Sequence, residues 1–188
     1  MNAQFRIRSH DMPAEMQVLL NQIPRDSWET HPGFQEKTRQ WLNAHQNFRR
    51  LAELVRKDTE AYLDKEMSVE DYERDLAIYG NRLVGNLHGH HGWEDHSYFP
   101  ELSAADPRFD KGLELLEKDH ADLDAVLDVF TRSANRAIKL AHLDPDKVRD
   151  EAGDVHEQAI AIEAFLDRHL SDEEELAVPI ILHHRLRG

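Results

Sequence analysis

Residues 113–130 read LELLEKDHADLDAVLDVF, and this stretch decides the fold. Its apolar residues recur at intervals of three and four, and a histidine fills one of the positions: Leu113, Leu116, His120, Leu123, Leu127 and Phe130. Such spacing places one continuous stripe on one face of an α-helix. The pattern therefore predicts an amphipathic helix from about Phe109 to Ala141 with a histidine in its buried stripe.

Three further stretches carry the same periodicity. One covers residues 33–64, one runs from Ser68 to about Tyr98, and one opens at Asp144-Pro145 and ends before Pro179. Ser68 with an acid three residues later is typical of a helix start. Their stripes are Trp41, His45, Phe48, Leu51 and Val55; Leu76, Leu83, Leu87, His90 and Glu94; and Val155, Ile162, Leu166, His169 and Glu173. Because the connections are short, neighbouring helices should be antiparallel, which predicts an all-α, up-down-up-down four-helix bundle.

The domain organisation follows from the limits of this periodicity. A chain of 188 residues suits a single domain. Residues 1–32 contain three prolines and no clear period, and they are expected to form an N-terminal extension with one short helix. The bundle is expected over residues 33–182 and a short tail over residues 183–188.

Composition excludes several classes of protein. Asp and Glu number 37 against 23 Lys and Arg, for a formal charge of −14, which disfavours binding to phosphate backbones or to anionic lipid. The chain has no cysteine, so disulfides, thiolate catalysis and iron–sulfur clusters are excluded. No apolar secretory region opens the sequence, and its longest apolar run is too short to span a bilayer. We therefore expect a cytoplasmic protein without nucleic-acid or membrane partners.

Two His-x-x-x-Glu pairs point to a metal site. Thirteen histidines are present, and each expected helix has one in its buried stripe. Residues four apart share a helix face, so His90 with Glu94 and His169 with Glu173 can each reach the bundle axis. A lone histidine precedes each pair by 45 to 49 residues, so the chain is a duplicated H…HxxxE unit. The predicted ligands are His45, His90, Glu94, His120, His169 and Glu173.

This pattern resembles the hemerythrin-like family of HHE cation-binding domains. The resemblance rests on His45, on the sequences HHGWE (90–94) and YFP (98–100), on Asp119-His120, and on HLSDEE (169–174) with Pro179. It implies a four-helix bundle holding two non-haem iron ions bridged by oxo or hydroxo, with terminal imidazoles from His45, His90, His120 and His169. Glu94 and Glu173 would be the bridging carboxylates. The symmetric H-HxxxE-H-HxxxE form differs from oxygen-carrying hemerythrins, which have a histidine where this chain has Asp124.

The donor chemistry leaves iron, manganese or zinc as the metal, since imidazole with carboxylate suits all three and thiolate is absent. The leading hypothesis is a protein that binds iron and dioxygen, or a related small oxidant, for sensing, storage or scavenging. One alternative is a di-iron oxidoreductase that decomposes peroxide or handles nitric oxide, although no further catalytic base is recognisable. Another is a metal-free helical interaction module with buried histidines.

Several other polar residues near these motifs have two interpretations. His91 and Asp95 lie one residue out of register and are expected to support the ligands by hydrogen bonds, with ligation by His91 as the alternative. Asp124 either completes a coordination sphere or is a carboxylate at the end of the bundle. We expect surface positions for His88, His96, Asp172, Glu174 and Glu175, and core packing for Trp41 and Trp93.

Overall fold

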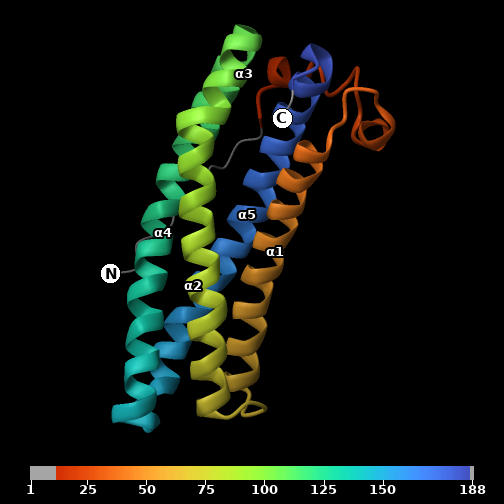
Figure 1. Cartoon of the computed structure of the whole chain (residues 1–188). Helices are drawn as coiled ribbons and strands as arrows, with labels where there is room; N and C mark the ends of the chain where they lie inside the picture. The colour runs from red at the N-terminus through yellow and green to blue at the C-terminus, as the bar shows by residue number, and fades with distance from the viewer. Residues whose placement is uncertain (1–11, 187–188) are drawn as a thin grey trace.

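Four long helices lie side by side and make up most of the molecule (Figure 1). The computed structural model describes residues 12–186, and all regular structure within that range is helical. The elements are η1 (Ala14–Gln17), η2 (Arg25–Thr30), α1 (Glu36–Leu63), α2 (Val69–Trp93), η3 (Glu94–Tyr98), α3 (Phe99–Ala105), η4 (Pro107–Phe109), α4 (Asp110–Leu143), η5 (Pro145–Lys147) and α5 (Val148–His184). The long helices are α1, α2, α4 and α5, and each corresponds to one of the four predicted stripes.

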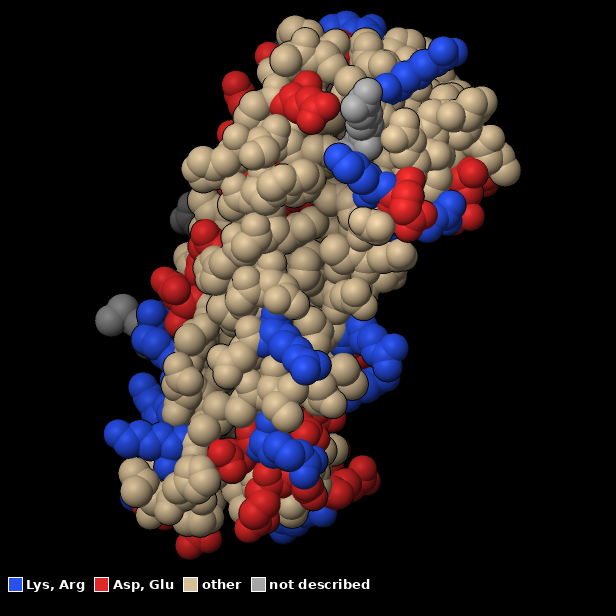
Figure 2. Space-filling view, viewed as in Figure 1, with Lys and Arg blue, Asp and Glu red and all other residues tan. Residues whose placement is uncertain are grey.

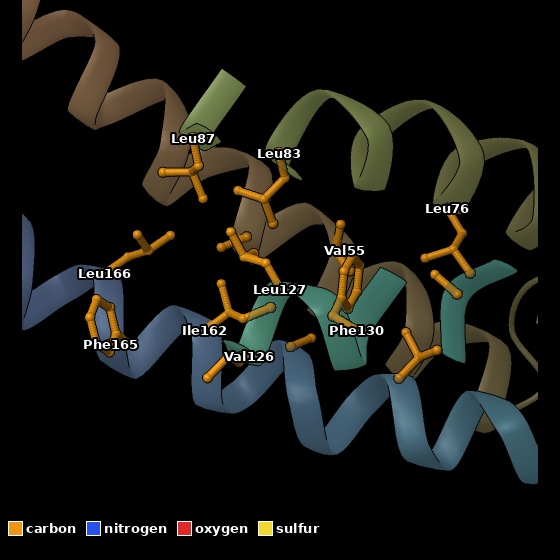
Figure 3. Close-up of a cluster of buried hydrophobic side chains, with 14 of the residues drawn as sticks. Val55, Leu76, Leu83, Leu87, Val126, Leu127, Phe130, Ile162, Phe165 and Leu166 are labelled. Carbon is orange, nitrogen blue, oxygen red and sulfur yellow. The ribbon is translucent and has the colours of Figure 1, made fainter. Parts of the chain in front are cut away.

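The apolar stripes form two separate clusters along the length of the bundle. The larger cluster joins all four long helices and includes Val55, Leu83, Leu127 and Ile162, whose side chains converge between the helices in Figure 3. The smaller cluster joins Trp41, Tyr98, Leu116 and Leu176 with other residues of α3, η4 and the end of α5. His45 on α1 and His120 on α4 each lie between a residue of the smaller cluster and one of the larger, and Glu173 lies between Leu170 and Leu176 on α5. The predicted site is therefore at the boundary between the two clusters.

The prediction that the second helix stops before Pro100 was wrong. The helix passes through a π-helical turn, η3, in which the Phe99 N–H donates to the Glu94 carbonyl, and continues as α3 to Ala105. Proline removes one helical hydrogen bond and its ring clashes with the carbonyl four residues earlier. The wider π-turn relieves that clash, and such turns are often found at functional sites.

The prediction that the fourth helix ends before Pro179 was also wrong. Helix α5 contains Pro179 and ends at His184, where Arg185 takes a left-handed conformation with φ of 55°. The residues around the proline are buried in the smaller cluster, including Val178, Ile180 and Ile181 at 0% exposure. Burial of these side chains offsets the lost hydrogen bond, since each contributes about 1.5–3 kcal/mol when fully removed from water.

Residues 12–35, the N-terminal segment, pack on the bundle. Met12, Met16, Leu19 and Trp28 are buried in the smaller cluster. In Figure 1 this red and orange segment lies beside the C-terminal end of α5. The segment therefore covers the end of the bundle that lies beyond the predicted metal ligands.

Charged side chains of both signs are interspersed on the face shown in Figure 2. Part of this charge is paired along single helices, as in the Lys118–Asp122 and Arg74–Asp71 ion pairs. In residues 12–186 no helix is both long enough and apolar enough to cross a membrane.

Candidate metal centre

Seven polar side chains meet in the gap between the two apolar clusters, and we call this set the polar layer. It consists of His45 from α1, His90 and His91 from α2, Glu94 from η3, His120 from α4, and His169 and Glu173 from α5. All six residues predicted as ligands are in it, and His91 is the addition. The side chain of His90 is 11% exposed, and the other six residues are at most 3% exposed.

One side of the layer is formed by α1 and α2. The Nε2 atoms of His45 and His90 are 2.9 Å apart, and His90 Nε2 is also 2.9 Å from Glu94 Oε1. From α5, Glu173 Oε2 comes within 3.6 Å of His45 Nε2. One ligand atom from each of His45, His90 and Glu94 lies within 4.8 Å of the others, close enough for a single cation to bind all three.

The other side of the layer is formed by α4 and α5. His120 Nε2 is 3.8 Å from Glu94 Oε2, and His169 Nε2 is 3.7 Å from Glu173 Oε2. Glu94, His120 and Glu173 form a second group within 4.8 Å, and His91, His120 and His169 form a third. Glu94 therefore belongs to groups on both sides of the layer, which is the position that a bridging carboxylate needs.

His91 reaches the layer because α2 packs between two neighbours. Successive residues on an α-helix point about 100° apart. His90 consequently faces α1, where it meets His45, while His91 faces α4 and stacks on His120 with ring centroids 4.0 Å apart. Ligation by His91 was the lesser alternative in the sequence because His91 lies one residue out of register with the apolar stripe of its helix. The adjacent pair His90-His91 was the signal available in the sequence.

Several buried polar atoms of the layer have no hydrogen-bond partner among the residues that the structure describes. Within residues 12–186, the buried atoms without a hydrogen-bond partner include Nδ1 and Nε2 of His91, Oε2 of Glu94, Nε2 of His120, Nδ1 and Nε2 of His169, and both carboxylate oxygens of Glu173. Leaving one such group unpaired costs about 1–3 kcal/mol, and more when it is charged. Cations bound between the side chains would satisfy these atoms and neutralise the carboxylates, so the residues present fit a metal centre.

Burial and neighbouring charges shift the pKa values of several side chains in the layer. Burial raises the pKa of Glu173 well above its ordinary value, and the charge of Glu94 raises it further. Burial also acts to raise the pKa of Glu94, but the neighbouring imidazoles of His45 and His90 outweigh it and hold that pKa well below the usual range. For His169, burial lowers the pKa to about 4, so the imidazole is neutral near pH 7 and can donate a lone pair to a metal.

Groups outside the layer hold several of its side chains in place. The sequence suggested core packing for Trp41. In the structure its indole N–H also donates a hydrogen bond to Glu94 Oε1 at 2.7 Å. Asp95 Oδ1 is 2.7 Å from His120 Nδ1. Asp119 Oδ2 is 3.5 Å from His169 Nδ1, longer than an ordinary hydrogen bond.

Other expectations for single residues divide between correct and wrong. Asp124 lies outside the layer, since its side chain is 51% exposed. Its Oδ1 is 3.1 Å from Nδ1 of His88, which is also exposed. Trp93 is 45% exposed, so the expectation of core packing was wrong. Glu174 is 1% exposed, so its assignment to a solvated acidic face was wrong as well. His96 is exposed, as expected.

A pocket opens beside the layer at its most exposed member. Its volume is about 290 Å³, and its lining consists of Lys37, Gln40, Trp41, Ala44, His90 and Trp93. The pocket therefore brings solvent to the flank of a predicted ligand, while the rest of the layer is sealed.

Comparison with known proteins identifies a family. No curated protein and no solved structure matched the chain. Residues 36–181 match the family described as the hemerythrin HHE cation-binding domain, and this range contains the whole polar layer. The chain is therefore a member of the hemerythrin HHE cation-binding family, and its buried histidine and glutamate groups are arranged so that they can hold metal.

Proposed function

We propose that the polar layer binds two iron ions and that the protein binds dioxygen or a related small oxidant there, for sensing, storage or scavenging. The observation that carries this proposal is the sharing of Glu94 between the group on the α1 side and the group on the α4–α5 side. Two overlapping groups imply two neighbouring cations rather than one closed site. In this proposal α1, α2, α4 and α5 form the expected up-down-up-down bundle, and the protein is cytoplasmic.

Each residue of the layer has a defined part in the proposal. His45 and His90 would hold one ion, and His120 and His169, with His91, would hold the other. Glu94 and Glu173 would bridge them. Two carboxylates against two divalent ions leave a net positive centre, and iron would supply reversible redox chemistry and affinity for small oxygen-containing ligands. Trp41 would fix the orientation of the Glu94 carboxylate, and the surrounding apolar clusters would exclude bulk water.

The pocket at His90 supports access by a small molecule. Only this side of the layer has an exposed ligand, and the pocket wall includes the apolar groups of Trp41, Ala44 and Trp93. A small neutral oxidant can cross such a wall without losing strong hydration. A large or highly charged substrate would meet the sealed faces of the bundle.

The direct test is the metal content of the purified protein after expression with sufficient iron. We expect about two iron atoms per chain by elemental analysis, and reversible absorbance changes when dioxygen is added and removed. A Glu94→Ala and Glu173→Ala double variant should lose the iron and should still show a helical circular dichroism spectrum. Iron near zero in the unmodified protein would refute the proposal.

Peroxide decomposition is a second candidate, and Tyr98 favours it. Its side chain is buried, its hydroxyl has no hydrogen-bond partner within the described residues, and burial together with the charges of Glu173 and Glu94 raises its pKa well above 10. The hydroxyl thus stays protonated and can donate to an oxygen-containing ligand. Rapid dioxygen release from hydrogen peroxide, slowed by Tyr98→Phe at unchanged iron content, would support this candidate over reversible binding.

A further inference from the structure

Glu174 is a buried carboxylate at the edge of the polar layer, where three donors from two other segments meet it. Arg25 Nη1 from the N-terminal segment donates to Oε2 at 2.7 Å, and Arg49 Nη1 from α1 donates to Oε1 at 2.8 Å. His45 Nδ1 is 3.0 Å from the same Oε1. Since a buried charge is stable only when well paired, the two arginines are what allow this carboxylate to remain ionised here.

The contact with His45 determines which ring nitrogen faces the metal ligands. A carboxylate accepts hydrogen bonds and donates none, so the proton of a neutral His45 ring must be on Nδ1. The lone pair is then on Nε2, which is 2.9 Å from His90 Nε2 inside the layer. A carboxylate that holds the outer nitrogen of a ligating histidine fixes both its tautomer and its ring orientation.

Arg25 connects this arrangement to the N-terminal segment. Its guanidinium lies 4.7 Å from the centre of the Trp28 ring, and Trp28 is buried at 3% exposure. The Trp28 indole also donates to the Ile23 carbonyl at 2.9 Å, so the turn that carries Arg25 is held by the docked segment. If the segment leaves the bundle, Glu174 loses one of its two cationic partners.

We propose that Glu174 is a positioning residue for His45, and that docking of the N-terminal segment, through Arg25, increases retention of the ion held by His45 and His90. The role of the N-terminal segment in ion retention rests on the proposed iron function, and the role of Glu174 in positioning His45 does not. The tautomer of His45 is a property of the protein without metal. Docking of the N-terminal segment is thus coupled to how tightly the ion on the His45 and His90 side of the layer is held.

Two measurements on the full-length protein test the proposal. The first is ring-nitrogen NMR on metal-free protein, with the His45 signals assigned through His45→Gln. We expect the Nδ1–H tautomer in the unmodified protein and a mixture in Glu174→Gln, because an amide can present either its oxygen or its NH₂ to Nδ1. The same tautomer in both proteins would overturn the positioning role.

The second measurement is the rate of iron release to a ferrous chelator, which should show two phases for two ions. Glu174→Gln should accelerate one phase by about 10-fold or more, the usual loss for an outer partner of a ligand. Arg25→Gln should accelerate the same phase by roughly twofold to fivefold, as for a half-exposed ion pair. Arg39→Gln is the matched control, because the ion pairs of Arg39 within residues 12–186 are with the exposed Glu29 and Glu36, and its guanidinium lies 5.0 Å from the centre of the Phe34 ring.

The outcomes separate a positioning role from a purely structural one. Equal acceleration of both phases, with an equally lowered melting temperature of the metal-free Arg25→Gln protein, would show that Arg25 only attaches the segment and would overturn the coupling. An unmodified protein that carries no iron would refute the proposed function and the coupling together. The tautomer measurement would still decide the role of Glu174 in that case.

Discussion

Replacing Glu173 with methionine should stabilise the metal-free protein and abolish its stabilisation by iron. Glu173 is 0% exposed, neither carboxylate oxygen has a hydrogen-bond partner in the described part of the chain, and burial with the nearby Glu94 charge raises its pKa. A carboxyl group in this position has been removed from water without compensation. Methionine has a similar length and no group that needs a partner, so the penalty disappears.

The magnitude follows from measured replacements of buried charged groups. Apolar substitutes of similar volume stabilise folded proteins by roughly 1–4 kcal/mol. In a chain of this size each kcal/mol changes the melting temperature by about 2–4 °C. Taking ~2 kcal/mol, metal-free Glu173→Met should melt about 4–8 °C above the metal-free unmodified protein.

The assay is thermal unfolding followed by circular dichroism, with a chelator and then with ferrous iron under argon. At free iron of 100 times the dissociation constant, the unmodified protein gains about 2.7 kcal/mol, or roughly 5–11 °C. The variant should gain much less, so the order of the two melting temperatures reverses. Glu157→Met, at an exposed position on the same helix, is the control and should stay within about 0.5 kcal/mol. The reasoning fails if metal-free Glu173→Met melts below the metal-free unmodified protein.

Three other changes probe the pocket, the core and one ion pair. Ala44→Phe fills part of the pocket beside His90 and should slow azide or dioxygen binding in stopped-flow measurements at unchanged iron content; an unchanged rate would rule out this route of entry. Leu127→Ala, at 0% exposure in the larger apolar cluster, should lower the free energy of unfolding by about 2–5 kcal/mol in urea titrations, and a loss below ~1 kcal/mol would contradict the packing. Hydrogen bonds from Arg108, and a smaller one from His184, lower the pKa of Asp106. A depressed carboxyl pKa stabilises the fold above the unfolded value of 3.8 and loses that contribution as the pH falls below it. The stability difference between the unmodified protein and Asp106→Asn should therefore be constant from pH 7 to about 5 and shrink in more acidic buffer, and a difference that grows on acidification would refute the assignment.

The spacing of apolar residues predicted the four long helices, because each of these helices buries one face. The stripe from Leu113 to Phe130 lies in α4 as expected, and the Ser68 hydroxyl accepts from the Asp71 N–H at the start of α2. The same periodicity located the predicted ligands, since His45 and His120 occupy stripe positions. The two helix ends that were predicted from the positions of prolines were wrong. A π-turn precedes Pro100, and tertiary packing surrounds Pro179, and each compensates for the hydrogen bond that the proline removes.

The details of the site required the packed structure. A sequence pattern reports the faces of one helix relative to its own axis, so it could not show that α2 presents His90 to α1 and His91 to α4. It also could not show that Glu174 meets Arg25, because 149 residues separate them in the chain.

The sequence by itself determined the helices, their buried faces and the repeated imidazole and carboxylate pairs, because these depend on contacts within one helical turn. Only the tertiary structure decided that His91 joins the layer, that Asp124 does not, and that the N-terminal segment reaches Glu174. Those outcomes depend on the rotation and neighbours of each helix in the bundle, which no local spacing encodes.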